Sequence, residues 1–97
     1  MAKKLKTNTK KVFQIIKGHF EPDEANEIIN YLIKKKIDFH QIKNLSTQER
    51  IGENDLQSLK RIDELRQTEK SIRIIINEAK KEKKSLTINS KISIEII

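Results

Sequence analysis

The chain has 97 residues, of which 35% are hydrophobic and 36% are charged. We expect one ordinary domain with a thin core, because a chain of this length buries only about 60–65% of its unfolded surface. It contains no cysteine, which excludes disulfides and thiolate chemistry and fits a reducing compartment. No run approaches the roughly 20 apolar residues of a membrane span, so we expect a cytoplasmic protein without a membrane segment.

The net charge of +7 is concentrated at the start of the chain. Residues 1–11 hold five lysines and no acid, whereas the other 86 residues hold 16 basic and 14 acidic side chains. Residues 1–9 are polar and lack periodicity, which predicts a disordered basic tail, followed by a single α+β domain over residues 10–97. One hypothesis for function is sequence-independent binding of nucleic acid by the lysines of this region, which are Lys3, Lys4, Lys6, Lys10 and Lys11.

A strand and a helix are predicted next. Residues 11–20 are rich in β-branched and aromatic side chains on both alternating faces, which predicts a strand buried on both sides. Pro22 then marks a helix start, because proline fits the first helical position and acids follow it at the positive end of the dipole. Apolar residues at helical spacing predict a helix over residues 22–36. The lysines at 34–36 suit the negative end of such a helix.

Residues 37–52 allow two interpretations. Ile37 and Phe39 alternate like a short strand over residues 37–43, which would complete a β-α-β unit with a right-handed crossover. Asp38 and Gln41 instead have the spacing of a capping box, which would start a short helix. We favour the strand, because a third strand gives a sheet enough partners to be stable.

A long amphipathic helix is predicted from residue 54 to residue 83. Its apolar residues recur every third position at first, as at Leu56, Leu59 and Ile62, and then shift around the helix to Ile72 and Ile76. At 100° per residue the two halves point roughly 110° apart. We therefore expect either a bend near residues 67–68 or two halves that pack on different surfaces, one of them on a second molecule.

The same helix also contains a heptad-like pattern that favours self-association. Positions 58, 62, 65, 69, 72, 76 and 79 follow one another at alternating spacings of four and three, although two of them are polar. We take the following residues of this pattern as the predicted interaction stripe of a homo-oligomer or of a complex with a protein partner: Leu65, Ile72, Ile76 and Ala79.

The final segment, residues 85–96, alternates apolar and polar side chains and predicts a half-exposed strand, or a hairpin that turns at Asn89–Ser90. Together these elements predict an α+β fold in the order β-α-β-α-β. Its mixed sheet has three strands, over residues 11–20, 37–43 and 85–96, and both helices cover one face.

We predict no catalytic, metal or cofactor site. His19 and His40 are the only histidines and lack metal-binding spacing, and the chain has too few glycines for a phosphate-binding loop. Ser46 and Glu49 near His40 suggest a hydrolytic cluster, but this spacing is more typical of a capping box. We therefore expect a non-enzymatic interaction or assembly protein, with a basic nucleic-acid-associated protein as the alternative.

Overall fold

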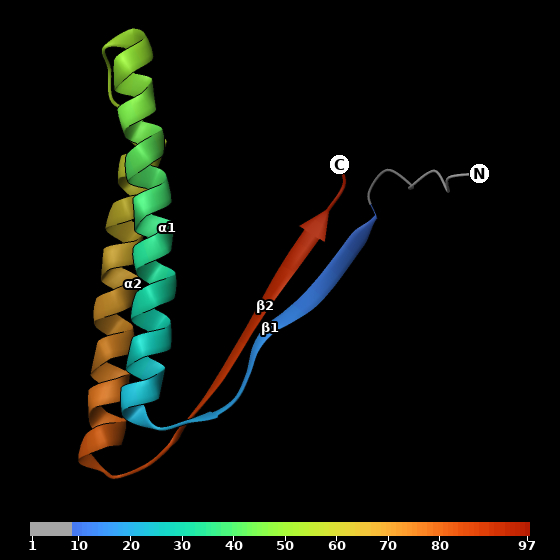
Figure 1. The fold of residues 1–97 in the computed structure, drawn as a ribbon, viewed down its shortest axis with the longest axis vertical. Helices are drawn as coiled ribbons and strands as arrows, with labels where there is room; N and C mark the ends of the chain where they lie inside the picture. Colours follow the sequence, from blue (N-terminus) through green and yellow to red (C-terminus); the bar gives the residue numbers. More distant parts are fainter. Residues whose placement is uncertain (1–8) are drawn as a thin grey trace.

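A computed structural model describes residues 9–97 and shows an α+β fold of two helices and two strands. Strand β1 (Lys10–Phe20) is followed by helices α1 (Pro22–Ile51) and α2 (Leu56–Lys81) and then by strand β2 (Leu86–Glu95). The helices form an antiparallel hairpin, the strands form an antiparallel ribbon, and the two parts diverge from a common base (Figure 1). The molecule is a thin slab with principal extents of 50 × 46 × 15 Å.

The predicted middle strand does not exist, because residues 37–43 belong to α1. The order is therefore β-α-α-β with a two-stranded sheet, and the three-stranded prediction was wrong. The helix starts at Pro22 as predicted, but it runs 15 residues past the predicted end at residue 36. It continues because Ile33, Ile37 and His40, with the later Asn44 and Thr47, keep one face against α2 at spacings of four and three residues.

Helix α2 is one continuous helix, and its buried residues form a single line along it. These residues, Ser58, Ile62, Leu65, Ile76 and Ala79, all belong to the heptad pattern of the sequence, and Glu69 and Ile72 between them are half-buried. This line packs against α1, so the helices form a short antiparallel coiled coil. We call this contact the seam. The prediction of two halves on different surfaces was wrong, because Ile62 and Ile76 share it.

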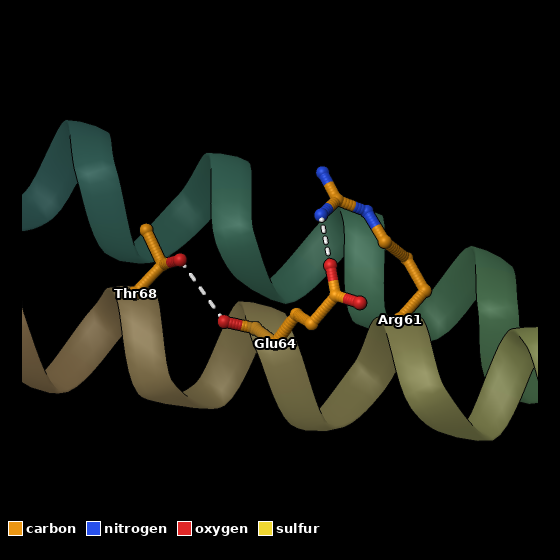
Figure 2. Close-up of polar contacts among 3 residues, drawn as sticks. All are labelled: Arg61, Glu64 and Thr68. Atoms are coloured by element: carbon orange, nitrogen blue, oxygen red, sulfur yellow. Dashed lines mark hydrogen bonds and ion pairs between the residues drawn. The ribbon is translucent and has the colours of Figure 1, made fainter.

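No break interrupts α2 near residues 67–68. The Thr68 hydroxyl donates to the carbonyl oxygen of Glu64 at 2.9 Å, and the Glu64 carboxylate accepts from Arg61 at 3.0 Å (Figure 2). Both interactions join residues on successive turns along the exposed side of the helix. A threonine that bonds back to the preceding turn is accommodated within a helix with at most a slight bend.

The helical hairpin turns at Gly52, which adopts the left-handed conformation with φ 72°. Its N–H donates to the Gln48 carbonyl at 2.8 Å and closes the last turn of α1. The Asn44 side chain then accepts from the Asp55 N–H at 2.6 Å. Asp55 caps α2 by accepting from the Ser58 N–H at 3.2 Å. Residues 44–55 therefore form the end of one helix, the turn and the cap of the next helix.

At the opposite end, polar contacts tie the start of α1 to the end of α2. Glu24 accepts from the Glu21 N–H at 3.0 Å, Lys80 pairs with Asp23 at 3.0 Å, and the Ser85 hydroxyl donates to Glu21 at 2.9 Å. Both strands leave from this base. These contacts lie at the base, where the two helices meet the two strands.

The ribbon extends away from the helices along most of its length (Figure 1). Strand β2 is a single strand and not a hairpin, because all of its residues pair with β1, from Leu86 opposite Phe20 to Glu95 opposite Lys10. The helices contact the ribbon only near the base, so the prediction that two helices cover one face of the sheet was wrong.

Candidate self-association surface

The ribbon has one apolar face and one polar face. Directly paired residues of an antiparallel ribbon lie on the same face, and alternate residues of a strand share it. The register therefore assigns Phe13, Ile16, Phe20, Leu86, Ile88, Ile92 and Ile94 to one face, which we call the ribbon apolar face. The opposite face carries His19, Lys17, Gln14, Lys91 and Ser93 together with further polar residues, and the register also places Val12 there.

A bulge at Ile15 brings Phe13 and Ile16 of β1 onto one face. Gln14 pairs with Lys91 and Ile16 pairs with Ser90, so Ile15 has no partner of its own. The extra residue changes the alternation. Phe13 and Ile16 consequently share a face although they are three residues apart. The sequence suggested a strand buried on both sides because the bulge is invisible in the pattern.

Only the base of the ribbon apolar face is covered by the helices. Leu86 and Ile88 line a shallow hollow of about 270 Å³ opposite a patch of both helices that comprises Ala25, Ile29, Ile72, Ile75 and Ile76. Farther out the same face is bare: Phe13 is 48% exposed, Ile92 47% and Ile94 56%. The face therefore extends from a part that packs on the helices to an outer part that no described residue of this chain covers.

The solvent-exposed area of the chain is larger than the area expected for a compact monomer of the same mass. The chain exposes 8377 Å², whereas roughly 5,800 Å² is expected for a folded monomer of this mass. Eight unfolded residues would account for only about 1,300 Å², so about half of the excess or more belongs to residues 9–97. The radius of gyration of 17.9 Å likewise exceeds the roughly 12.5 Å of a compact chain of this length.

The predicted interaction stripe lies within the seam of one chain. Leu65, Ile76 and Ala79 are buried, Ile72 is half-buried, and the helix they contact is α1. Their side chains are therefore occupied by an intramolecular contact in this structure. The exposed hydrophobic residues lie instead on the ribbon, on the outer side of α1 and, away from the seam, on α2.

The lysines proposed for nucleic-acid binding fall largely outside the described residues. Lys10 and Lys11 begin β1 and are exposed, on opposite faces of the ribbon, whereas Lys3, Lys4 and Lys6 lie outside the described part of the chain. The structure therefore brings no cluster of these lysines together within residues 9–97.

The residues suggested for hydrolysis do not form a site. Ser46 and Glu49 are exposed on α1, and Ser46 lies six residues and so about 120° around the helix from His40. Among residues 9–97, no group of three or more His, Asp and Glu side chains could hold a metal ion. Neither helix of this part of the chain is long and apolar enough to cross a membrane.

His40 instead lies in the seam without a hydrogen-bond partner. Both ring nitrogens are buried, and its ring packs edge-on to Phe39 with ring centres 5.2 Å apart. Burial lowers the pKa of His40 below its usual value, and the positive charges of Lys36, Arg61 and Lys43 lower it further. Asp55 opposes this shift only weakly, so the folded chain favours the neutral imidazole.

Acid is therefore expected to destabilise the helical hairpin. Below the ordinary histidine pKa of 6.5 the unfolded chain binds a proton that the folded chain does not, so the free energy of unfolding falls as the pH drops from about 7 toward 5. Urea denaturation followed by helical circular dichroism measures this slope. His40→Leu should flatten it and raise stability at pH 5, and His19→Gln serves as the control. An unchanged slope in His40→Leu would contradict the assignment.

No protein-family model matches this chain, and comparisons with curated proteins and with solved structures found no match.

Proposed function

We propose that this protein is a non-enzymatic assembly module that associates with further copies of itself through the ribbon apolar face. The observation that carries the proposal is the bare outer part of this face, on which Phe13, Ile92 and Ile94 stay about half exposed. An isolated two-stranded ribbon is at best marginally stable in water. Ten of the eleven residues of β1 pair with β2, so we expect a covering layer that stabilises this ribbon.

A second copy fits this face better than a charged partner does. The face carries one charged residue, Lys11 opposite Ile94, and the other side chains of its outer part are Phe13, Ile92 and Ile94. An apolar face of this kind can pack on itself across a two-fold axis, because such an interface uses the same patch twice. The excess surface of residues 9–97, about 1,300 Å² per chain and so about 2,600 Å² for two copies, is also of the size that stable homodimers bury, roughly 2,000–5,000 Å² in total.

Sedimentation equilibrium at micromolar concentrations tests the proposal. We expect an average mass of at least twice the 11.4 kDa of one chain. Because apolar burial drives the contact, 0.5 M sodium sulfate should strengthen the assembly. A monomeric mass at all concentrations from 1 to about 100 micromolar would overturn the proposal, since stable homodimers of this size remain associated in that range.

A further inference from the structure

Each strand of the ribbon has one edge paired with the other strand and a second edge to which no strand of residues 9–97 is bonded. At the end of the ribbon the Ile96 N–H donates to the Thr9 carbonyl oxygen at 2.9 Å. The backbone groups of successive residues point to opposite sides of a strand. Even-numbered residues of β2 therefore bond to β1, whereas Lys91, Ser93 and Glu95 direct their N–H and C=O groups to the open edge.

The open edge of β1 is irregular, whereas that of β2 is regular. In β1 the bulge at Ile15 shifts the outward-pointing backbone groups from even to odd residues, so their spacing is three instead of two between Gln14 and Lys17. A regular strand cannot stay in register across this break. Strand β2 has no bulge, and its ten residues include no glycine or proline. Natural proteins protect strand edges with such irregularities, and β2 lacks them.

We propose that β2 pairs along its open edge with β2 of a second copy of the chain, so that two ribbons form one four-stranded antiparallel sheet. The outer part of the ribbon extends away from the helices, which contact β2 only near the base (Figure 1). A strand of a second copy can therefore reach residues 91–95, all of which are exposed. Three or more strands with an apolar face are also what a sheet needs for independent stability.

The side chains of β2 select one register for this pairing. With Ser93 of the two copies opposite each other at a two-fold axis, Lys91 of each copy lies opposite Glu95 of the other. The same register places Ile92 of each copy opposite Ile94 of the other. Opposed residues of an antiparallel pair share a face, so the charged pairs lie on the polar face and the isoleucines on the ribbon apolar face.

Other registers are less favourable. An axis at Lys91 sets two lysines opposite each other, and an axis at Glu95 does the same with two carboxylates. An axis at residue 92 or 94 leaves Lys91 opposite an uncharged side chain. With the axis at Ser93, Glu95 lies between two lysines, because Lys10 of its own chain is opposite it on the other side. A second copy of β2 is therefore a strand of complementary charge for this edge.

The inference deepens the proposed function and rests on it for the choice of a second copy as partner. A two-fold axis perpendicular to the sheet keeps the ribbon apolar faces of both copies on the same side. The four-stranded sheet then offers a larger apolar face than one ribbon does, and two such sheets can pack face to face. A chain with two different two-fold contacts joins more than two copies, so we expect a tetramer.

Proline substitutions test the edge directly. Ser93→Pro removes an N–H that points to the open edge and breaks no bond to β1, but it takes a bond from each strand at the two-fold axis. Association through the edge should weaken at least about tenfold. Val12→Pro is the matched control, because Val12 pairs with Ser93 and directs its N–H to the open edge of β1. It should assemble as the wild type does, and equal effects of both prolines would contradict a contact at β2.

Residue-resolved hydrogen exchange, followed by NMR, distinguishes edge pairing from packing of the faces alone. In the wild type the amides of Lys91, Ser93 and Glu95 should be protected, because they bond to the second copy. The amides of Lys10 and Val12 on the open edge of β1 should exchange rapidly. Rapid exchange at both edges in the assembled protein would overturn the edge contact. Protection that appears only after a different protein is added would overturn the choice of a second copy.

A charge exchange tests the register. Lys91→Glu places two carboxylates opposite each other on both sides of the axis, and Glu95→Lys does the same with lysines, so each variant should associate through the edge roughly tenfold more weakly. An equimolar mixture restores both pairs and should associate at least about threefold more tightly than either variant alone. Lys17→Glu, on the polar face of β1, is the control and should match the wild type. Failure of the mixture to recover would overturn the register centred on Ser93.

Sedimentation of two variants separates the edge contact from the face contact. Ser93→Pro should stop assembly at a dimer held by the faces, and Phe13→Asp, on the ribbon apolar face of β1, should stop it at a dimer held by the edges. The combination should be monomeric, while circular dichroism at the helical wavelengths stays unchanged.

The remaining outcomes decide between the two proposals. If the wild type is a dimer that Phe13→Asp dissociates and Ser93→Pro leaves intact, the proposed function stands and the edge contact is wrong. If Ser93→Pro dissociates that dimer and Phe13→Asp leaves it intact, the edge contact stands and the face contact fails. If the wild type is monomeric at every concentration, both fail.

Discussion

Replacing Ile92 with aspartate is expected to remove the ribbon contact while the helical hairpin stays folded. Ile92 pairs with Phe13 at the centre of the bare part of the ribbon apolar face and is 47% exposed. A carboxylate there must lose its hydration when a second copy covers the face, and no cation on the face lies directly opposite it. We expect the ribbon-mediated association to weaken about a hundredfold or more, as for a charge placed at the centre of an apolar contact.

Hydrogen exchange gives this variant a readout that does not depend on the number of copies in the assembly. Without its covering layer the ribbon is at best marginally stable, so the amides of β1 and β2 should exchange much faster than in the wild type. The amides along the seam should keep their protection. Val12→Asp introduces the same charge on the polar face and should change neither exchange nor sedimentation. Equal effects of both substitutions would contradict an apolar contact on one face.

Replacing Leu65 with alanine is expected to be the most destabilising single change in the helices. Leu65 lies at the middle of the seam and is 8% exposed. Truncating a buried leucine costs about 2–5 kcal/mol of unfolding free energy, because the lost contacts leave a cavity. A domain of this size is stabilised by only about 5–15 kcal/mol. The midpoint of thermal unfolding should therefore fall by about 10 °C or more at a fixed protein concentration.

This substitution also distinguishes an intramolecular seam from a contact between chains. Ile74→Ala, at a 66% exposed position on the same helix, is the matched control and should change stability by less than about 0.5 kcal/mol. If Leu65→Ala left the unfolding midpoint unchanged but dissociated the assembly, Leu65 would belong to an interface between copies. That result would favour the stripe predicted from the sequence over the seam of the structure.

The sequence pattern predicts the apolar face of the ribbon for β2 but not for β1. The alternation over residues 85–96 shows which residues of β2 share a face, and the structure confirms it as one strand. The alternation in β1 is interrupted by the bulge at Ile15, so Phe13 and Ile16 looked as if they pointed to opposite faces. A local sequence pattern also cannot show that the outer part of the ribbon extends away from the helices and that its apolar face stays exposed.

The sequence by itself determined the α+β class, the start of α1 at Pro22 and nearly the whole of α2, because helix starts and apolar periodicity are local signals. It also contained the heptad line of α2, from Ser58 to Ala79. The tertiary structure decided what that line contacts. The half-polar face of α1, with His40, Asn44 and Thr47, has no clear apolar period, and in the structure this face packs against α2 within a helix that continues to Ile51. Once the two helices bury each other, the ribbon and the outer side of α1 remain exposed.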